Sequence, residues 1–304
     1  MSICFRKSRP SLICAIFFWI TASLSTTCFA QSAPTTTTPE PTPSPTPSLE
    51  RMFFRNILRD QRAIWTSPFN LKRENMRWLA PLGLSTAALM ATDRHTSGDL
   101  VENGDNLTRL RVSKDISRFG SLYATGGMAA AFYLTGRAKN DARARETGLL
   151  GAEALIDSGI LVEALKTVTQ RQRPPTDHSS GEFFDGGSSF PSGHAINAWS
   201  LATVVADEYG QHRPLVRFGA YGLVTAVSLS RYTGRNHFLS DVLVGSAMGY
   251  GIGRYVYRQH HDPSLDSASQ EQTSGVERSR LFPRIAPLYY PRAHIYGAML
   301  AWNF

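Results

Sequence analysis

Between Leu49 and about residue 259 the sequence is a succession of long windows rich in Ala, Leu and Gly, with few strand-like alternations. This texture is typical of helices that bury one face. It predicts helices at 51–64, 73–92, 109–117, 119–135, 141–170, 192–208, 213–230 and 240–258. A hydrophobic content of 42% and a charged content of 18% are compatible with a sizeable core. We therefore expect an all-α helical bundle over residues 49–259.

The last residues have a different pattern. RIAPLYYPRAHIYGAMLAWNF is rich in Tyr and Ile and has the turn-like segment PRAH in its middle. This pattern predicts a short C-terminal β-hairpin within residues 280–304. The Asp-Pro and Ser-rich stretch before it predicts a linker over residues 260–279.

The N-terminus has the layout of a secretory signal. Three basic residues (Arg6, Lys7 and Arg9) precede the apolar segment LICAIFFWITASL, and Ala30 provides a small residue at a cleavage point. The apolar segment is shorter than the roughly 20 residues that span a bilayer comfortably. We expect a signal peptide at 1–30, a Thr/Pro-rich linker at 31–48, and export to the periplasm or cell envelope. A retained signal anchor is the alternative.

Cysteine use and charge narrow the chemistry. Cys4, Cys14 and Cys28 all lie within the predicted signal peptide, so the mature chain would contain no cysteine. That excludes disulfides, thiol catalysis and cysteine–zinc sites. The formal net charge of +8 favours anionic substrates or membrane surfaces in a general way, and we expect no nucleic-acid partner.

The apolar windows are short for membrane spans. The window 141–170 also carries Glu153, Asp157 and Glu163, and acidic residues are costly in a bilayer centre. These features favour a soluble or peripheral bundle, with partial embedding as the alternative.

Two of three polar clusters indicate anion binding. In KTVTQRQRPP, Lys166 and Arg173 are two helical turns apart and can project from one face, with Arg173 at the helix end before Pro174. In SSFPSGHA, Ser192 is a natural N-cap and Gly193 permits close backbone approach at a helix start, beside His194. The alternatives are a basic helix C-terminus and ordinary capping.

The third cluster, SRYTGRNHFLSD, places His237 and Asp241 four residues apart at the start of a helix. The carboxylate can accept a hydrogen bond from one ring nitrogen and leave the other nitrogen as a nucleophile. Arg231 offers a planar fork for phosphate oxygens. A surface ion pair, or a metal site completed by His194, is the alternative. The cations Lys166, Arg173 and Arg231 favour an oxyanion over a divalent metal.

These three clusters, in this order and spacing, resemble the signature of the type 2 phosphatidic acid phosphatase (PAP2) and vanadium haloperoxidase superfamily. Every signature position is matched: Lys166, Arg173, Pro174, Pro191, Ser192, Gly193, His194, Ser230, Arg231, His237 and Asp241. The resemblance covers roughly residues 110–258 and implies a PAP2-like helical bundle.

The resemblance also implies a mechanism. His237 would attack phosphorus and form a phosphohistidine, with Asp241 holding its imidazole in the attacking tautomer. His194 would protonate the leaving oxygen and then activate water. Lys166, Arg173, Ser192, Gly193 and Arg231 would bind the phosphate. No metal or other cofactor is expected. Vanadate would be a cofactor only if the chain were a haloperoxidase.

We expect an exported phosphatase acting on a lipid-linked phosphate or diphosphate, with possible membrane-surface association. A soluble broad-specificity acid phosphatase, a vanadium haloperoxidase and a non-enzymatic envelope protein are the alternatives, and the sequence specifies no oligomeric state. Arg171 and Arg235 flank signature positions and are expected only to add positive field. The histidines outside the signature are expected to be solvated: His95, His178, His212, His260, His261 and His294.

Overall fold

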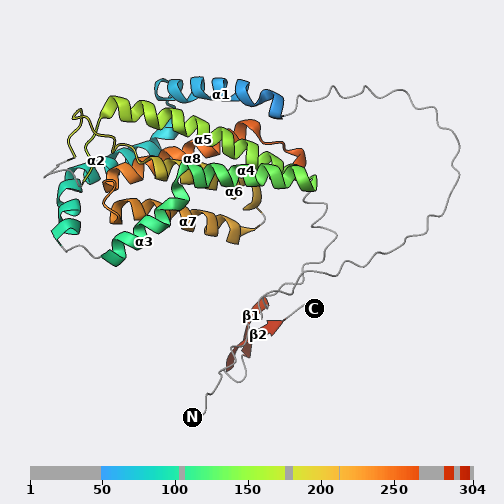
Figure 1. The fold of residues 1–304 in the computed structure, drawn as a ribbon. Coiled ribbons are helices and arrows are strands. Elements are labelled where there is room, and N and C mark those ends of the chain that lie inside the picture. The colour runs from blue at the N-terminus through green and yellow to red at the C-terminus, as the bar shows by residue number, and fades with distance from the viewer. Residues whose placement is uncertain are drawn as a thin grey trace, which may run out of the picture. The chain divides into compact units, whose positions relative to one another are not determined.

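The computed structural model describes residues 49–102, 107–174, 181–211, 213–266, 284–290 and 295–301. The helices are α1 (Leu49–Thr66), α2 (Arg73–Glu102), α3 (Leu107–Ser117), α4 (Leu122–Lys139), α5 (Ala142–Thr169), α6 (Gly193–Tyr209), α7 (Pro214–Thr233) and α8 (Leu239–His260). Two 3-10 turns, η1 (Ser67–Phe69) and η2 (Arg118–Gly120), follow α1 and α3. Figure 1 shows these helices gathered into a bundle, as the apolar periodicity predicts.

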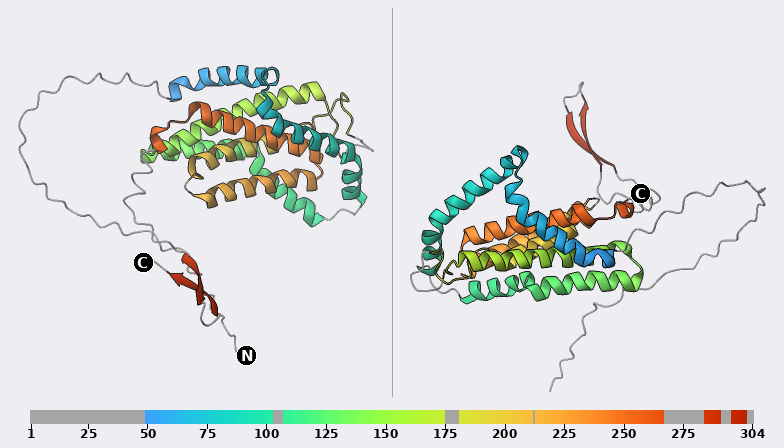
Figure 2. Two further views of the ribbon diagram at one scale, coloured as in Figure 1. Left: turned by 180° about the vertical axis from the view of Figure 1, so that it is seen from behind. Right: turned by 90° about the horizontal axis from the view of Figure 1, so that it is seen from above.

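Three helices form the centre of the bundle. α5, α6 and α8 pack on one another, and their apolar faces make one buried cluster that includes Leu150, Ile196 and Val256. α4 covers α5, and α7 packs against α6 on another side. Both views in Figure 2 show α1 lying along the outside of the bundle. The polar clusters therefore sit on the most buried helices.

Close contact between α6 and α8 depends on small residues. A Cβ atom added at Gly245 would lie 2.7 Å from the carbonyl oxygen of Ser192, and one added at Gly249 would lie 2.4 Å from that of Ile196. Both separations are shorter than real carbon atoms tolerate, so only glycine allows this approach. The contact places the N-terminus of α8 directly beside that of α6.

The observed helices agree with the predicted windows to within a few residues, except at one end. α2 continues ten residues beyond the predicted end at 92. Its extension turns polar residues inward: Asp93 is 1% exposed and Ser97 is 9% exposed. The spacing of apolar residues cannot predict this part of α2, because the side chains that it buries are polar.

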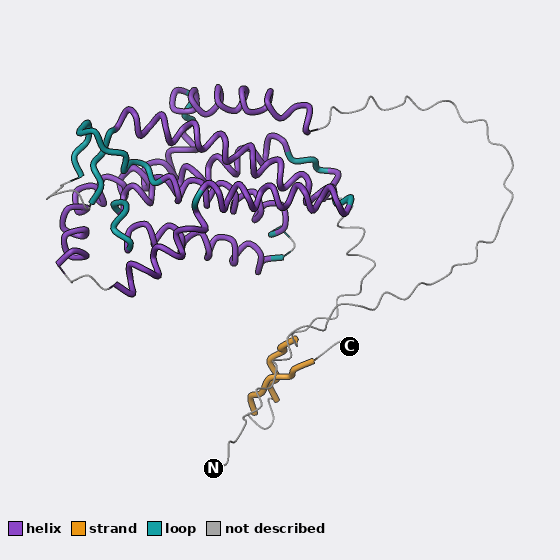
Figure 3. Tube along the Cα trace, in the orientation of Figure 1, coloured by secondary structure: helices purple, strands orange, loops and turns teal. Residues whose placement is uncertain are grey.

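The loops that carry the polar clusters lie at one end of the bundle. Figure 3 shows the loop from α5 to α6 and the turn from α7 to α8 at the same end. A backbone hydrogen bond of 3.1 Å from the Ser192 amide to the Asp241 carbonyl joins the two segments directly. This end of the bundle is the candidate site.

The predicted linker at 260–279 begins too early. His260 closes α8, and four of the next six residues (His261, Asp262, Leu265 and Asp266) still contact the bundle. Arg143 of α5 forms an ion pair of 2.7 Å with Asp266. The reason is charge: histidines and acids here pair with buried acids and an arginine of α5. The remainder of that linker, the signal peptide at 1–30 and the linker at 31–48 lie outside the described residues.

The C-terminal strands are β1 (Arg284–Tyr290) and β2 (Ile295–Ala301), drawn as an antiparallel pair with Arg284 opposite Ala301. The all-α bundle is confirmed as the fold class. An ordered C-terminal hairpin stays a prediction. Within the described residues, no helix combines the length and apolar character that a bilayer crossing requires.

Candidate active site

The first cluster lies across the end of α5. Lys166 is on the last turn of the helix, which stops at Thr169 because Gln170 adopts a left-handed conformation with φ 43°. Arg173 is therefore in the following loop, and its Nη2 donates to the Ser188 hydroxyl at 3.4 Å. The expectation that both cations project from one helix face is wrong. The loop nevertheless returns Arg173 to the same place.

Ser192 holds the N-cap position of α6, but its hydroxyl makes no capping bond. The side chain is fully buried, and its oxygen has no hydrogen-bond partner among the described residues. A buried unpaired hydroxyl is costly unless a ligand completes it. Lys166 Nζ lies 3.5 Å from the point where a Cβ of Gly193 would be, so the cation faces the free amides of the helix start.

His237 is 2% exposed, and its ring orientation fixes its tautomer. Nδ1 lies 2.7 Å from the backbone carbonyl oxygen of Ser189. Because a carbonyl can only accept a hydrogen bond, Nδ1 carries the proton and Nε2 carries the free lone pair. Burial lowers the pKa of His237 in spite of the neighbouring Asp241, so the ring stays neutral near pH 7. A neutral imidazole with a free lone pair on Nε2 is the form that can act as a nucleophile.

Asp241 does not contact the His237 ring as closely as predicted. Its Oδ2 lies 3.7 Å from Nδ1, and it accepts hydrogen bonds from the Ser189 hydroxyl and from the Phe238 amide at 3.1 Å. Ser189 thus connects the two groups: its hydroxyl donates to Asp241 while its carbonyl accepts from His237. Burial alone would raise the pKa of Asp241, but its contacts with His237, Arg171 and Ser189 lower it. Its charge is kept beside the imidazole.

Arg171, expected only to add positive field, is a central structural residue. It is 2% exposed, and its guanidinium forms ion pairs with Asp93 at 2.9 Å and with Asp241 at 2.5 Å. The same guanidinium stacks over Phe238, 4.4 Å from the ring centroid. Asp93 also accepts from the Ser240 hydroxyl. A buried arginine requires such compensation, so α2, the loop after α5 and α8 are joined through one charged chain.

Positive charge dominates the rest of the site. Arg231 is 7% exposed and donates to the Ser117 hydroxyl at 3.0 Å. Burial, with the charge of Arg173, lowers the pKa of Arg231 to about 10. Burial also lowers the pKa of His194 to about 4, helped by Arg231, His237, Lys166 and Arg173. Cations that disfavour one another in the free protein are stabilised by a bound oxyanion.

The low pKa of His194 gives a prediction. In the free protein its imidazole should titrate near pH 4, so that it is neutral at pH 6; a bound dianion should favour the charged form and raise the midpoint. Nitrogen-15 NMR of the histidine rings, with His194→Asn to assign the signal, measures both midpoints with and without orthovanadate. An ordinary midpoint near 6.5 in the free protein, unmoved by the anion, would contradict this electrostatic description.

The structure thus brings all eight predicted site residues to one end of the bundle, although their catalytic roles stay predictions. The described groups with metal-ligand spacing lie elsewhere: Asp60 with Glu153 and His260, and Glu146 with Glu208 and His261. His260 and His261 were expected to be solvated, and this is wrong, because both pair with buried carboxylates. His95 is exposed as expected, whereas His178, His212 and His294 lie outside the described residues.

Comparison with known proteins places the chain in a family. A sequence model of the PAP2 superfamily matches residues 147–264. The decaprenylphosphoryl-5-phosphoribose phosphatase of Mycobacterium tuberculosis is 33% identical over 150 residues, which are 48% of this chain and 78% of that protein. The chain belongs to the PAP2 superfamily.

Other similarities are shorter or weaker. The lipid A 1-phosphatase of Porphyromonas gingivalis is 36% identical over 70 residues, 23% of this PAP2 chain and only 16% of that protein. A solved transmembrane PAP2-type phosphatidylglycerolphosphate phosphatase from Bacillus subtilis has 23% identity and a TM-score of 0.44, over 66% of this chain and 98% of that one. The family and its phosphatase relatives identify the PAP2 chain as a phosphatase, a hydrolase.

Proposed function

We propose that this protein hydrolyses a lipid-linked phosphate ester or diphosphate through a phosphohistidine on His237. The observation that carries the proposal is the buried, neutral His237 whose protonated Nδ1 donates to Ser189 and whose Nε2 is free to attack. The cations Lys166, Arg173 and Arg231 supply the positive charge that a phosphoryl group needs.

In the first step, the Nε2 lone pair of His237 forms a bond to phosphorus as the bond to the leaving oxygen breaks. His194, protonated once the substrate dianion offsets the surrounding cations, gives its proton to that oxygen. The alcohol or the phosphorylated product leaves, and the phosphoryl group remains on Nε2. The charge that develops on Nδ1–H is stabilised by the Ser189 carbonyl and by Asp241, 3.7 Å away.

In the second step, neutral His194 accepts a proton from water as the water oxygen attacks phosphorus. The P–N bond breaks, inorganic phosphate forms, and Nε2 regains its lone pair. The Ser192 hydroxyl and the free amides at the start of α6 bind the equatorial oxygens together with the cations. Protein groups thus provide the charge neutralisation, and neither step requires a metal.

A lipid-linked substrate is supported by the surroundings of the site. The two curated relatives are named for phosphatases of lipid A and of a decaprenyl-linked sugar phosphate. An apolar cavity of about 560 Å³ lies between α1, α2, α5 and α8, lined by Leu161 and Leu165 of α5 and Val244 and Met248 of α8. Leu165 adjoins Lys166, and Val244 lies one helical turn beyond Asp241. An acyl or polyprenyl chain can lie there while its phosphate occupies the site.

Surface and sequence features support a location at the cell envelope. Large apolar side chains are exposed on several helices, among them Phe54, Trp78, Leu84 and Phe218. Such side chains suit contact with a membrane surface. The predicted signal peptide at residues 1–30 implies export, and export is part of the proposal. The proposal also takes residues 49–259 as the phosphatase domain.

The proposal is tested with purified mature protein against phosphatidate, a polyprenyl diphosphate and p-nitrophenyl phosphate, each with EDTA. Halide oxidation with added vanadate is measured in parallel. We expect metal-independent phosphate release, fastest per enzyme from a lipid-linked substrate in mixed micelles. A preference for p-nitrophenyl phosphate would overturn the lipid assignment and leave a broad-specificity phosphatase. Halide oxidation without phosphate release would overturn the phosphatase assignment itself.

A further inference from the structure

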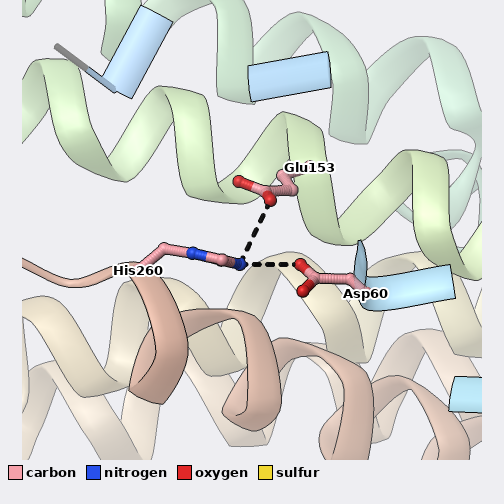
Figure 4. Close-up of side chains that lie close together, drawn as sticks. All are labelled: Asp60, Glu153 and His260. Atoms are coloured by element: carbon pink, nitrogen blue, oxygen red, sulfur yellow. Dashed lines mark hydrogen bonds and ion pairs between the residues drawn. The ribbon is translucent and has the colours of Figure 1, made fainter. Parts of the chain in front are cut away.

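His260, the last residue of α8, lies between two buried carboxylates. Its Nε2 is 2.8 Å from Oδ2 of Asp60 on α1 and 3.4 Å from Oε1 of Glu153 on α5. Figure 4 shows both acids directed at the same ring nitrogen from two different helices. The relative exposures of Asp60 and Glu153 are 0% and 1%. Three helices therefore meet at a group of ligand-type atoms that is closed to solvent.

The acids of this group are not fully paired by the protein. Within the described residues, Asp60 Oδ1, Glu153 Oε1 and, one turn along α5, Asp157 Oδ2 are buried without a hydrogen-bond partner. Asp157 is itself fully buried, and its other oxygen accepts from Gln61 at 2.9 Å. Buried carboxylate oxygens are among the most costly groups to leave unpaired. Their presence in three side chains points to a ligand that the protein atoms do not supply.

The acids around His260 outnumber the cations that face them. Burial, with the neighbouring acids, raises the pKa of Glu153 to about 9, and burial raises the pKa of Asp157 to about 7. Asp60, Glu153 and Asp157 face a single imidazole, and none of the ion pairs among the described residues joins these acids to a lysine or arginine. The nearby Arg59 instead donates to the amide oxygen of Asn56 at 3.1 Å. A cation at this point would displace the protons that the acids otherwise hold and would pair with the carboxylates.

The neighbouring group around His261 is different. His261 contacts Glu146 at 2.8 Å and Asp266 at 3.1 Å. There Arg143 forms an ion pair with Asp266, and the Asp262 amide donates to Glu146 at 2.9 Å. Glu208 also belongs to this group: both of its carboxylate oxygens are buried without a hydrogen-bond partner among the described residues, and Oε1 lies 3.4 Å from His261 Nδ1. The difference from the His260 group is the protein cation, Arg143, and this makes the second group the internal comparison.

We infer that Asp60, Glu153 and His260 form a structural binding site for one divalent transition-metal ion of the Zn²⁺ or Mn²⁺ kind. Their ligand atoms lie within 4.8 Å of one another, which is compatible with coordination to one centre. One imidazole nitrogen with carboxylate oxygens suits these ions better than Ca²⁺ or Mg²⁺, which prefer oxygen alone. Binding through Nε2 displaces any proton on that nitrogen, and the ion takes its place between the carboxylates.

The position of this site makes its role structural. Glu153 precedes Lys166 by thirteen residues on α5, about 20 Å along the helix axis, and His260 follows Asp241 by nineteen residues on α8, about 28 Å. An ion there cannot reach the phosphate. It joins α1 to α5 and α8 and raises the stability of the folded chain in proportion to its binding.

The test uses the full mature chain, purified without a histidine tag and dialysed against EDTA. Metal content after incubation with ZnCl₂ or MnCl₂ is measured by mass spectrometry, and the melting temperature (Tm) by circular dichroism. We expect one bound equivalent and a higher Tm in the wild type. Glu153→Gln should bind about tenfold more weakly or worse, and lose the rise in Tm. Glu208→Gln, the same change at a buried acid of the His261 group, should retain both.

Several outcomes overturn the inference. Stripped wild-type protein that binds neither ion, or whose Tm neither ion raises, contradicts it whether or not the variants fold. Equal binding by wild type and Glu153→Gln contradicts it, as does loss of the ion in Glu208→Gln alone. Because metal content and Tm do not involve substrate, the result is independent of the proposed phosphatase activity.

Removal of the ion by EDTA is expected to lower the Tm. The phosphatase assay with EDTA must therefore be carried out well below the Tm of the stripped protein.

Discussion

Replacing His237 with alanine is expected to abolish phosphate release. The change removes the only atom proposed to bond to phosphorus, and loss of a covalent nucleophile lowers kcat by about 10⁶-fold in well-studied hydrolases. His95→Ala, at an exposed histidine of α2, is the matched control and should keep wild-type activity. The measurement is phosphate release from the best substrate, with Tm recorded for both variants.

The intermediate itself can be trapped in the same experiment. Quenching the wild-type reaction in alkali, where a P–N bond persists, should leave phosphate on the peptide that contains His237. The alanine variant should show none. Phosphate on another residue, or wild-type turnover by His237→Ala, would contradict the mechanism.

The second large effect is expected for His194→Ala, and it should depend on the leaving group. General acid catalysis contributes roughly 10²- to 10⁴-fold, and an alkyl oxygen needs the proton whereas p-nitrophenolate leaves readily without it. The variant should therefore lose most of its rate with an alkyl or lipid phosphate in the first step. With p-nitrophenyl phosphate the first step should remain fast.

The second step supplies a distinctive signal. Since His194 is also proposed to activate water, the variant should release one equivalent of p-nitrophenolate in a burst and then turn over slowly. Stopped-flow absorbance measures the burst, and retained orthovanadate binding shows that the site is intact. Equal losses with both substrates and no burst would indicate that His194 serves only in binding.

The sequence predicted the positions of the helices well because most of them bury an apolar stripe. It also identified the eight residues that meet at the end of the bundle, because each lies close to the end or the start of a helix and these positions can be recognised from local sequence. It placed Arg173 on a helix because nothing local announces the left-handed turn at Gln170. Helix ends depend on such single residues.

The features that local patterns missed are long-range charge pairs. Arg171 resembled a flanking cation because its partner Asp93 is 78 residues earlier in the chain. His260 resembled a solvated histidine because Asp60 is 200 residues away. Both acids lie on helices that precede the family match, which begins at residue 147. Only the folded chain reveals which charges are buried together.

The ion chain from Asp93 through Arg171 to Asp241 has a consequence for how this protein can be divided. A shortened chain that begins at the family match would retain every signature residue and still lack α2. Arg171 would then lose its ion pair with Asp93 and keep only the one with Asp241. A buried arginine with a single partner is less well compensated for its lost hydration. We therefore expect a fragment that begins at residue 147 to be less stable than one that includes α2, and a hybrid with a related protein to be more stable when α2 and the loop after α5 are exchanged together.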